Sequence, residues 1–448
     1  MVPMPRQRHP GPRTRPGRSG RPAPRPRPDV VDPEVGREVE LEIGPVAHGG
    51  HCVARLDGRV VFVRHTLPGE RVVARVTETG SRFWRADAVE VLEPSADRVP
   101  SAWPQAGPGG VGGAELAHVE LGAQRAWKAA VLAEQLSRLA KLDREVDVEA
   151  APGDVERGGL GYRTRIELVA DAEGRAGMRR FRSHDVEPLT AMPLATQDVA
   201  DLAEAEGVWT RRWTPGARLE LVAPAGGADP VLLVDGTPWR RGRADTRPNA
   251  RRAVTEALHL GDGRDFRYRV SADGFWQVHR EAPGVLVGAA LAALGDVDGA
   301  QVLDLYSGAG LFTLPLAAAV GAAGRVVAVE GDARAVKDAR RNAHDLPGVE
   351  LHLGAVDRVL ADGDAGGSAV GRADAVVLDP PRAGAGRAVV DAVAARGPAR
   401  VVYVACDPAA LARDVAYLAS HGYGLTGLRA FDLFPHTHHV EAVAVLDR

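Results

Sequence analysis

Cys406 is the residue whose type and position most directly suggest chemistry. It is one of only two cysteines in 448 residues, and it lies in the run V-V-Y-V-A-C-D-P, where an apolar stretch stops at a polar dipeptide and a proline. This pattern predicts a β-strand followed by a loop. Because open α/β sheets carry their chemistry at the carboxyl ends of strands, a thiol at this point is a candidate nucleophile. A small buried cysteine without a chemical role is the alternative.

Glu441 is the second candidate, because it interrupts the apolar run that closes the sequence, V-E-A-V-A-V-L. A carboxylate is costly to bury unless it is paired or has a function. Its position therefore suggests an acid that is paired or has a function, and an unpartnered acid at the edge of the fold is the alternative.

A ligand site is indicated by residues 302–317, V-L-D-L-Y-S-G-A-G-L-F-T-L-P-L-A, which predict a buried strand, a glycine turn and the start of a helix. Gly308 and Gly310 would let the backbone approach a ligand closely. The next strand ends in Glu330, where an acid can accept hydrogen bonds from ribose hydroxyls. The dinucleotide fingerprint would need a third glycine, which argues against NAD. The D-x-Y-x-G-x-G pattern instead resembles the first motif of class I S-adenosylmethionine-dependent methyltransferases.

Asp379-Pro380-Pro381-Arg382 follows another predicted strand. An acid and two prolines at a strand end resemble the motif by which nucleic-acid and amine methyltransferases hold the target group near the methyl donor. Consecutive prolines stiffen the backbone and remove its donors. A simple strand terminator is the alternative.

The elements that must position these residues follow from hydrophobic patterning. Residues 34–94 alternate five short apolar runs with glycine turns, which predicts a small β-barrel. Residues 95–275 hold a linker, a helix over 116–142 and then mixed strands and loops, which we interpret as a central α+β domain. From 276 to 448, helices alternate with strands, so we expect an α/β, Rossmann-like domain. The apolar positions of the linker helix are Leu132, Leu136 and Leu139.

Composition narrows the class of protein. Two distant cysteines fit a reducing cytosol, so we expect a cytoplasmic protein. No run approaches the roughly 18 apolar residues of a membrane helix, so we expect no membrane partner. Residues 1–28 carry eight arginines, nine prolines and no acid; without them the net charge of −3 becomes −11. We interpret residues 1–33 as a disordered basic tail that either holds phosphates non-specifically or has no role.

Taken in order, these motifs closely resemble the uracil-5 RNA methyltransferases, a family that acts on tRNA and rRNA. The resemblance spans residues 34–448. It implies that the barrel is a TRAM domain, that the central domain binds RNA, and that the last domain binds S-adenosylmethionine. The matching stretches are F-W-Q-V (275–278), D-L-Y-S-G-A-G (304–310), Glu330, L-D-P-P-R-A-G (378–384), Y-V-A-C-D-P (403–408) and D-L-F-P-H-T-H-H-V-E (432–441).

The same resemblance implies roles for single residues. Cys406 is the expected nucleophile and Glu441 the expected base. The expected cofactor-binding residues, including the two glycines noted above, are Gln277, Tyr306, Gly308, Gly310, Glu330 and Asp379.

The chemistry explains why such residues are needed. Thiolate attack at carbon 6 of uracil makes carbon 5 nucleophilic toward a sulfonium methyl group, and a base must then remove the carbon 5 proton so that the thiol can leave. Cys406 therefore needs an electropositive, accessible setting, and Glu441 needs a pKa raised by apolar surroundings. The uracil must also leave its stack. Phe275, Trp276 and Phe434 are aromatic candidates for contact with it, and core packing is their alternative role.

The chain departs from the family at the cysteines that hold an iron–sulfur cluster in many members. Trp103-Pro104, Val111 to Ala114 and Met192-Pro193 occupy the matching places, and none of them can donate a thiolate. We predict no cluster, with apolar packing around Trp103, Val111 and Met192 in its place.

Histidines and one leucine mark smaller departures. His279 stands where the family usually has Asn, and Leu311 where some members carry Asn. His436, His438 and His439 look like a metal cluster, but the family's P-H-T pattern favours a structural loop. We therefore predict no metal site.

These observations predict an enzyme that uses S-adenosylmethionine to methylate carbon 5 of a uridine in RNA through a covalent Cys406 adduct. We expect a monomer, with rRNA favoured over tRNA. One alternative is an RNA cytosine-5 methyltransferase, but those enzymes typically carry Cys within or near the D-x-P motif, which residues 379–382 lack. Another is a non-catalytic RNA-binding protein, against which the presence of both Cys406 and Glu441 argues.

Overall fold

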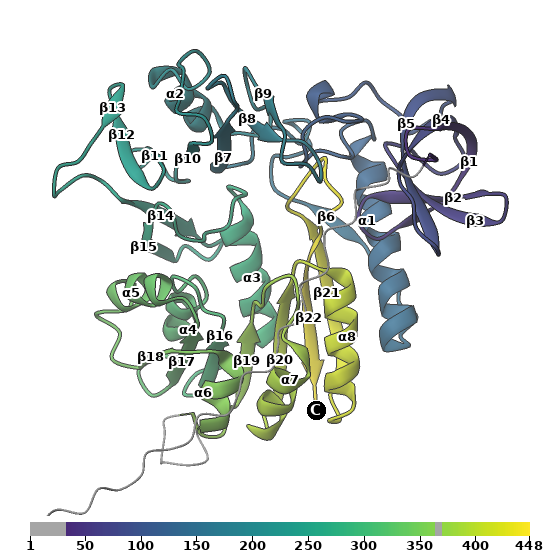
Figure 1. Ribbon diagram of the computed structural model, residues 1–448. Coiled ribbons are helices and arrows are strands. Elements are labelled where there is room, and N and C mark those ends of the chain that lie inside the picture. The colour runs from purple at the N-terminus through teal and green to yellow at the C-terminus, as the bar shows by residue number, and fades with distance from the viewer. Residues whose placement is uncertain (1–32, 363–369) are drawn as a thin grey trace, which may run out of the picture.

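The computed structural model of the protein describes residues 33–362 and 370–448 and shows three parts in chain order (Figure 1). A small barrel comes first, an antiparallel sheet second, and an eight-stranded sheet flanked by helices third. This α/β architecture with an N-terminal barrel is the predicted fold class. The predicted tail lies outside the described residues, apart from its last position. Within the described ranges, no helix has the length and apolar character needed to cross a membrane.

The N-terminal barrel is closed by strands in the order β1-β2-β3-β5-β4, which confirms the five predicted strands. Side chains alternate between core and solvent along its strands, as Val72, Ala74 and Val76 of β4 show by facing inward. Cys52 is fully buried in this core, and burial raises the pKa of its thiol to about 12. This cysteine is therefore a packing residue. The strands are β1 (Glu38–Ala47), β2 (His51–Leu56), β3 (Arg59–Arg64), β4 (Arg71–Glu78) and β5 (Phe83–Glu93).

The central part is built on a seven-stranded antiparallel sheet with the order β13-β12-β11-β10-β7-β8-β9. A separate hairpin, β14–β15, leads from this sheet into the C-terminal part. The elements are β7 (Arg165–Ala170), β8 (Ala176–Arg179), β9 (Val186–Pro188), α2 (Gln197–Ala205), β10 (Arg218–Val222), β11 (Val231–Val234), β12 (Thr237–Arg240), β13 (Arg243–Ala244), β14 (Ala253–His259) and β15 (Asp265–Ser271).

The segment that matches the cluster region of the family packs against this central sheet. Trp103 and Val111 are each only 2% exposed, and Met192 lies partly buried against the same apolar core. The predicted apolar packing is therefore confirmed. The absence of an iron–sulfur cluster stays a prediction, made from side chains that cannot donate a thiolate.

The C-terminal sheet has the order β18-β17-β16-β19-β20-β22-β21-β6, and strands β16 to β20 run parallel in it. Strand β22 runs antiparallel between β20 and β21. The elements are α3 (Ala282–Leu294), β16 (Gln301–Leu305), α4 (Thr313–Val320), β17 (Arg325–Glu330), α5 (Ala333–Asn342), β18 (Val349–Leu353), α6 (Val356–Asp362), β19 (Ala375–Leu378), α7 (Gly386–Ala395), β20 (Arg400–Ala405), α8 (Pro408–Ala419), β21 (Gly424–Asp432) and β22 (Glu441–Asp447).

Two elements from the linker region join this last sheet. Helix α1 (Leu121–Gln135) continues into a π-helical turn, and Leu132 and Leu136 are fully buried in the core of the C-terminal sheet. Strand β6 (Val148–Ala150) pairs with β21. Leu139, expected on the same buried face, is 43% exposed, because the wider turn rotates it away from the core.

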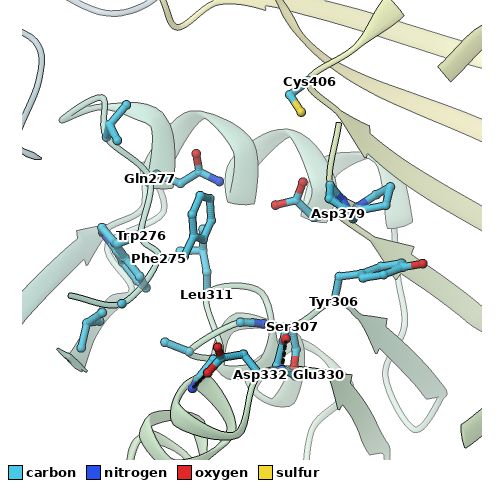
Figure 2. Close-up of a pocket in the computed structure, with 18 of the residues that line it drawn as sticks. Phe275, Trp276, Gln277, Tyr306, Ser307, Leu311, Glu330, Asp332, Asp379 and Cys406 are labelled. Atoms are coloured by element: carbon cyan, nitrogen blue, oxygen red, sulfur yellow. Dashed lines mark hydrogen bonds between the residues drawn. The ribbon is translucent and has the colours of Figure 1, made fainter. Parts of the chain in front are cut away.

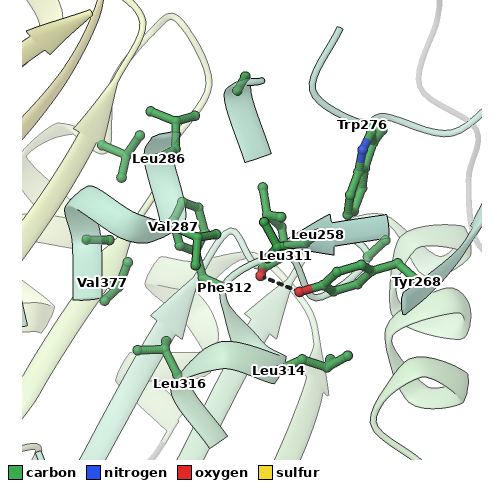
Figure 3. Packing of buried hydrophobic residues seen from close by; sticks show 14 of the residues in the cluster. Leu258, Tyr268, Trp276, Leu286, Val287, Leu311, Phe312, Leu314, Leu316 and Val377 are labelled. Atoms are coloured by element: carbon green, nitrogen blue, oxygen red, sulfur yellow. Dashed lines mark hydrogen bonds between the residues drawn. The ribbon is translucent and has the colours of Figure 1, made fainter. Parts of the chain in front are cut away.

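The hairpin is fixed to the glycine turn of the C-terminal sheet by a buried contact (Figure 3). Tyr268 of β15 packs beside Trp276 and donates a hydrogen bond of 3.0 Å to the Leu311 carbonyl. Leu311 and Trp276 are both buried in this core, together with residues of α3 and α4. Residues 275–278, which follow the hairpin, are thereby held over the carboxyl edge of the sheet.

Candidate active site

A cavity of about 710 Å³ lies at the carboxyl edge of the C-terminal sheet (Figure 2). This is the size range of cofactor and small-molecule sites. Cys406 and Asp379 lie at one end of it, and Glu330 and Asp332 lie at the other. All but one of the predicted site residues line it: Gln277, Tyr306, Gly308, Glu330, Asp379, Cys406 and Glu441. Gly310 does not line the cavity, but it belongs to the same turn, where its N–H donates a hydrogen bond to the Ser307 carbonyl.

The sheet topology explains this gathering. Because strands β16, β17, β19 and β20 are parallel, their carboxyl ends share one edge, and Tyr306, Glu330, Asp379 and Cys406 each stand at or just after the end of one of them. Gln277 reaches the same edge from the segment after the β14–β15 hairpin. Strand β22 runs the other way and begins at that edge with Glu441. Ala405 pairs with Ala442 across the two strands, so Cys406 and Glu441 are neighbours in the register.

The thiol of Cys406 has an acidic setting. It is half-buried, and burial is the main cause that raises its pKa to about 12. The charges of Glu441 and Asp379 raise it further, and Arg382 opposes them. The electropositive setting that we expected for a reactive thiol is therefore wrong for the protein without substrate, because the acids used by the same site surround the sulfur.

Glu441 and Asp379 are both held in conditions that favour their neutral forms. Glu441 is 5% exposed, and burial raises the pKa of its carboxyl group well above the usual range, as predicted. Burial also raises the pKa of Asp379 to about 7, with a contribution from Asp304. The value for Asp379 suits a group that exchanges protons near neutral pH.

The other end of the cavity has the features of a nucleoside site. The Glu330 carboxylate accepts hydrogen bonds from Gly308 N–H at 2.9 Å and Asp332 N–H at 2.7 Å, which fixes it in the cavity wall. The Ser307 hydroxyl is buried without a partner in the same wall. Gly308 has a φ of +56°, and the space where a side chain would stand is open. A fixed acid, a free hydroxyl and a close backbone approach fit S-adenosylmethionine.

Tyr306 stands between the two ends of the cavity in a rare backbone conformation. Its φ is +65°, in the left-handed region that non-glycine residues seldom adopt. Its N–H donates to the Val329 carbonyl at 2.9 Å, which fixes the turn at the strand end. Such local strain is typical of positions that present a side chain or backbone to a ligand.

The loop that carries Phe434 to Val440 is tied to helix α1 by a buried ion pair. Lys128 pairs with Asp432 and donates to the Phe434 carbonyl at 3.0 Å, and both charged side chains are almost fully buried. Gln124 of the same helix accepts a hydrogen bond of 2.6 Å from His436 N–H. Helix α1 thereby positions the approach to Glu441.

We expect Lys128→Met to lower the free energy of unfolding by about 3 kcal/mol or more, because Asp432 would stay buried without its partner. Urea unfolding of the variant and the wild type measures this. Lys141→Met is the matched control, because Lys141 is exposed and bonds only the Arg138 carbonyl. Equal losses in the two variants would contradict a structural role for the buried pair.

The three histidines of this loop contact different partners. His436 bonds the Gly158 carbonyl at 2.9 Å, His438 bonds Glu115, and His439 lies 3.2 Å from a guanidinium nitrogen of Arg382. Their contacts are those of the structural loop that we predicted. Among the residues that the structure describes, no group of three potential ligands is placed to hold a metal ion.

Aromatic residues near the cavity divide into packing and exposed groups. Trp276 is 4% exposed and packs on Tyr268, so its role is in the core. Phe275 lines the cavity and is 74% exposed, an unusual position for a phenylalanine. His279 is buried on Asp154 at 2.9 Å and does not line the cavity, so the departure from Asn there leaves the site wall intact.

The barrel touches the loop that follows Cys406. His48, which directly follows strand β1, lies 3.3 Å from the carboxylate of Asp407. Asp407 also caps helix α8 by accepting from Ala410 N–H at 2.8 Å. The hydrogen bond between the two side chains raises the pKa of His48. No motif in the sequence pointed to this contact.

Two arginines in the cavity wall also escaped sequence reasoning. Arg163 and Arg382 both line the cavity, and the Nε of Arg163 is buried without a partner. Arg382 stands in the D-P-P-R motif, but that motif gave the arginine no role of its own, and Arg163 lies in no motif. Their cationic groups are suited to an anionic or carbonyl-rich ligand.

Comparison with known proteins places this site in a family. Residues 33–89 match the model of the TRAM domain, and residues 371–448 match that of tRNA (Uracil-5-)-methyltransferase. A relative from Streptomyces coelicolor, named as an uncharacterized RNA methyltransferase, is 45% identical over 92% of this chain and 93% of its own. The 23S rRNA (uracil(1939)-C(5))-methyltransferase RlmD of Alkalilimnicola ehrlichii is 34% identical over 91% of this chain and 96% of its own.

A solved structure supports the same fold. The Pyrococcus abyssi tRNA (uracil-54, C5)-methyltransferase, in complex with S-adenosyl-L-homocysteine, superposes with a TM-score of 0.65 at 23% identity over 91% of this chain and all of that one. The relatives cover both the barrel and the catalytic sheet. This chain belongs to the TRAM-containing family of S-adenosylmethionine-dependent RNA uracil-C5 methyltransferases.

Proposed function

We propose that the protein methylates carbon 5 of a uridine in rRNA through a covalent bond between Cys406 and carbon 6 of the base. The observation that carries this proposal is the meeting of Cys406, Glu441 and Asp379 at one end of a cavity whose other end suits a nucleoside. The name of the Alkalilimnicola relative supports rRNA over tRNA. We further propose that the protein acts as a monomer in the cytoplasm.

The residues of the chain divide the chemistry between them. The Cys406 thiolate adds to carbon 6, which places an electron pair at carbon 5. S-adenosylmethionine, when bound, supplies the methyl group that carbon 5 takes. Glu441 removes the proton from carbon 5, the electron pair reforms the double bond, and the thiolate leaves. Asp379 and Arg382 face the same space and orient the base through its polar edge.

The residues of the glycine turn and of the segments next to it bind the cosubstrate. Glu330 is the acid placed to accept from the ribose hydroxyls, Gly308 allows the close backbone approach, and Gln277 and Tyr306 line the remaining wall. Phe275, exposed at the mouth, is free to stack on an RNA base, as aromatic side chains do with unstacked nucleotides.

We expect Glu330→Gln to weaken S-adenosylmethionine binding at least roughly 10-fold, because a hydrogen bond to a charged acceptor is worth about 1.5–3 kcal/mol. Isothermal titration calorimetry measures the change. Glu350→Gln is the matched control, because this acid lies on the neighbouring strand, bonds Arg325 and does not line the cavity. An unchanged affinity in Glu330→Gln would remove this residue from the binding site.

The proposed function is tested by mapping 5-methyluridine in rRNA and tRNA from a deletion strain. Loss of the methyl group at one or more rRNA uridines is the expected result. Unchanged methylation at every uridine would overturn the proposal, and loss of a 5-methylcytidine instead would favour the cytosine-5 alternative.

A further inference from the structure

The tip of the β12–β13 hairpin carries three neighbouring arginines that form no salt bridge with any residue that the structure describes. Arg240 and Arg243 face each other directly across the two strands, and Arg241 stands in the turn between them. All three side chains are exposed. In the described part of the chain, none of them forms a salt bridge, although Arg240 acts through space on the Asp245 carboxylate, which is bonded to Arg247. We call these three residues the arginine tip.

This arrangement costs stability, because like charges directly opposite in an antiparallel pair repel each other. Two other exposed arginines on or next to the same sheet are paired with acids. Arg180 pairs with Glu187 at 2.7 Å, and Arg218 pairs with Glu167 at 3.0 Å. An unfavourable cluster of unpaired cations on a chain with a net charge of −3 points to an anionic partner.

The backbone under the arginine tip is held rigidly. The Glu206 carboxylate accepts hydrogen bonds of 2.9 Å from both turn N–H groups, those of Arg241 and Gly242. Arg211 donates to the Gly242 carbonyl at 3.1 Å and lies over the rings of Trp213 and Trp239. Arg241 and Gly242 both have positive φ, which is the tight turn suited to the twist of a hairpin. The backbone that carries the three charges is therefore preorganised, which lowers the entropy cost of binding.

The place of the arginine tip in the molecule indicates the partner. Figure 1 shows β12–β13 and the barrel at opposite sides of the molecule, with the β14–β15 hairpin between β12–β13 and the C-terminal sheet. The chain runs from β13 through a loop with three more arginines, Arg247, Arg251 and Arg252, into the β14–β15 hairpin and on to Phe275. A polyanion that contacts the arginine tip can therefore continue toward the mouth of the cavity.

We propose that the arginine tip binds phosphate groups of the RNA substrate at a distance from the target uridine. The inference rests on the proposed function for the identity of the polyanion. It goes beyond that function by assigning a second contact surface and by requiring an RNA long enough to reach both the tip and the cavity. Arginine guanidinium groups suit this role, because they bind phosphate oxygens in a two-pronged manner.

The test compares two triple variants of the full-length protein. Arg240→Gln/Arg241→Gln/Arg243→Gln removes the arginine tip. Arg180→Gln/Arg218→Gln/Arg429→Gln removes the same number of charges from arginines that are exposed but paired with acids. Binding of an unmodified 23S rRNA transcript is measured by filter retention across a range of salt concentrations, and thermal melting checks the fold.

The tip variant is expected to lose at least roughly 10-fold in affinity and to show a slope of log affinity against log salt that is smaller by about three. The control variant is expected to keep the wild-type slope. Removal of repelling charges should leave the melting temperature of the tip variant unchanged or higher. Binding of a short oligouridine, which cannot span from cavity to tip, should fall less than binding of the transcript.

Equal slopes for the two variants would overturn the proposal. So would a tip variant that binds the transcript normally but no longer binds vesicles of phosphatidylserine and phosphatidylcholine, since an acidic lipid surface would then be the partner. Failure of the proposed function is distinguished by transfer of a labelled methyl group to the same transcript. If the wild-type protein binds the transcript through the arginine tip but does not methylate it, the proposed enzymatic function is overturned and the proposed role of the arginine tip stands.

Discussion

Cys406→Ala is expected to abolish methyl transfer to RNA, with a loss in kcat of about 10⁴-fold or more, because removing a covalent nucleophile removes the reaction path itself. RNA containing 5-fluorouridine gives a second measurement. Fluorine replaces the proton that the base must remove, so the wild type should stop as a covalent complex that survives a denaturing gel. The Cys406→Ala variant should form no such complex.

The chain offers an unusually clean control, because Cys52 is its only other thiol. Cys52 is buried in the barrel and makes only a weak contact, 3.6 Å, with the Thr66 carbonyl. Cys52→Ala should therefore keep both methyl transfer and the covalent complex. A covalent complex that persists in Cys406→Ala would show that another group attacks the base.

The barrel could be predicted from local pattern, and the closeness of Cys406 to Glu441 could not. Alternating apolar residues and glycine turns are enough to place the strands between residues 34 and 93. Cys406 and Glu441 come together only because β22 turns back antiparallel beside β20, with Ala405 opposite Ala442. Nothing in the spacing of the two residues reveals that register. The expectation that they act together therefore rested on the resemblance of this chain to a known family.

Electrostatic properties were the least predictable from sequence. A reactive thiol suggested positive surroundings, but the structure places Glu441 and Asp379 close enough to raise the pKa of Cys406. These acids come from different strands, so their joint effect exists only in three dimensions. The same holds for the arginine tip, because only the strand register shows that Arg240 and Arg243 face each other.

Glu441→Gln is expected to have the opposite signature from Cys406→Ala: the covalent complex should accumulate while turnover falls. A general base contributes about 10²- to 10⁴-fold, so kcat should drop by that amount. A charge on Glu441 raises the pKa of Cys406, so a neutral glutamine should not raise that pKa and should leave attack on the base unimpaired. The adduct then forms on ordinary uridine RNA with S-adenosylmethionine present, but it cannot be resolved.

A denaturing gel of the enzyme with labelled RNA separates these outcomes. Asp447→Asn is the matched control, because Asp447 is the acid at the other end of the same strand, where it pairs with Arg400 at 2.7 Å far from the cavity. It should turn over normally and accumulate no adduct.

If Glu441→Gln also turned over normally, the base would have to be sought among the other acids of the cavity, and Asp379, whose pKa is raised to about 7, would be the first to test. A Glu441→Gln variant that neither turned over nor formed an adduct would instead show that Glu441 acts before the bond to sulfur forms. Its role would then be to position the uracil.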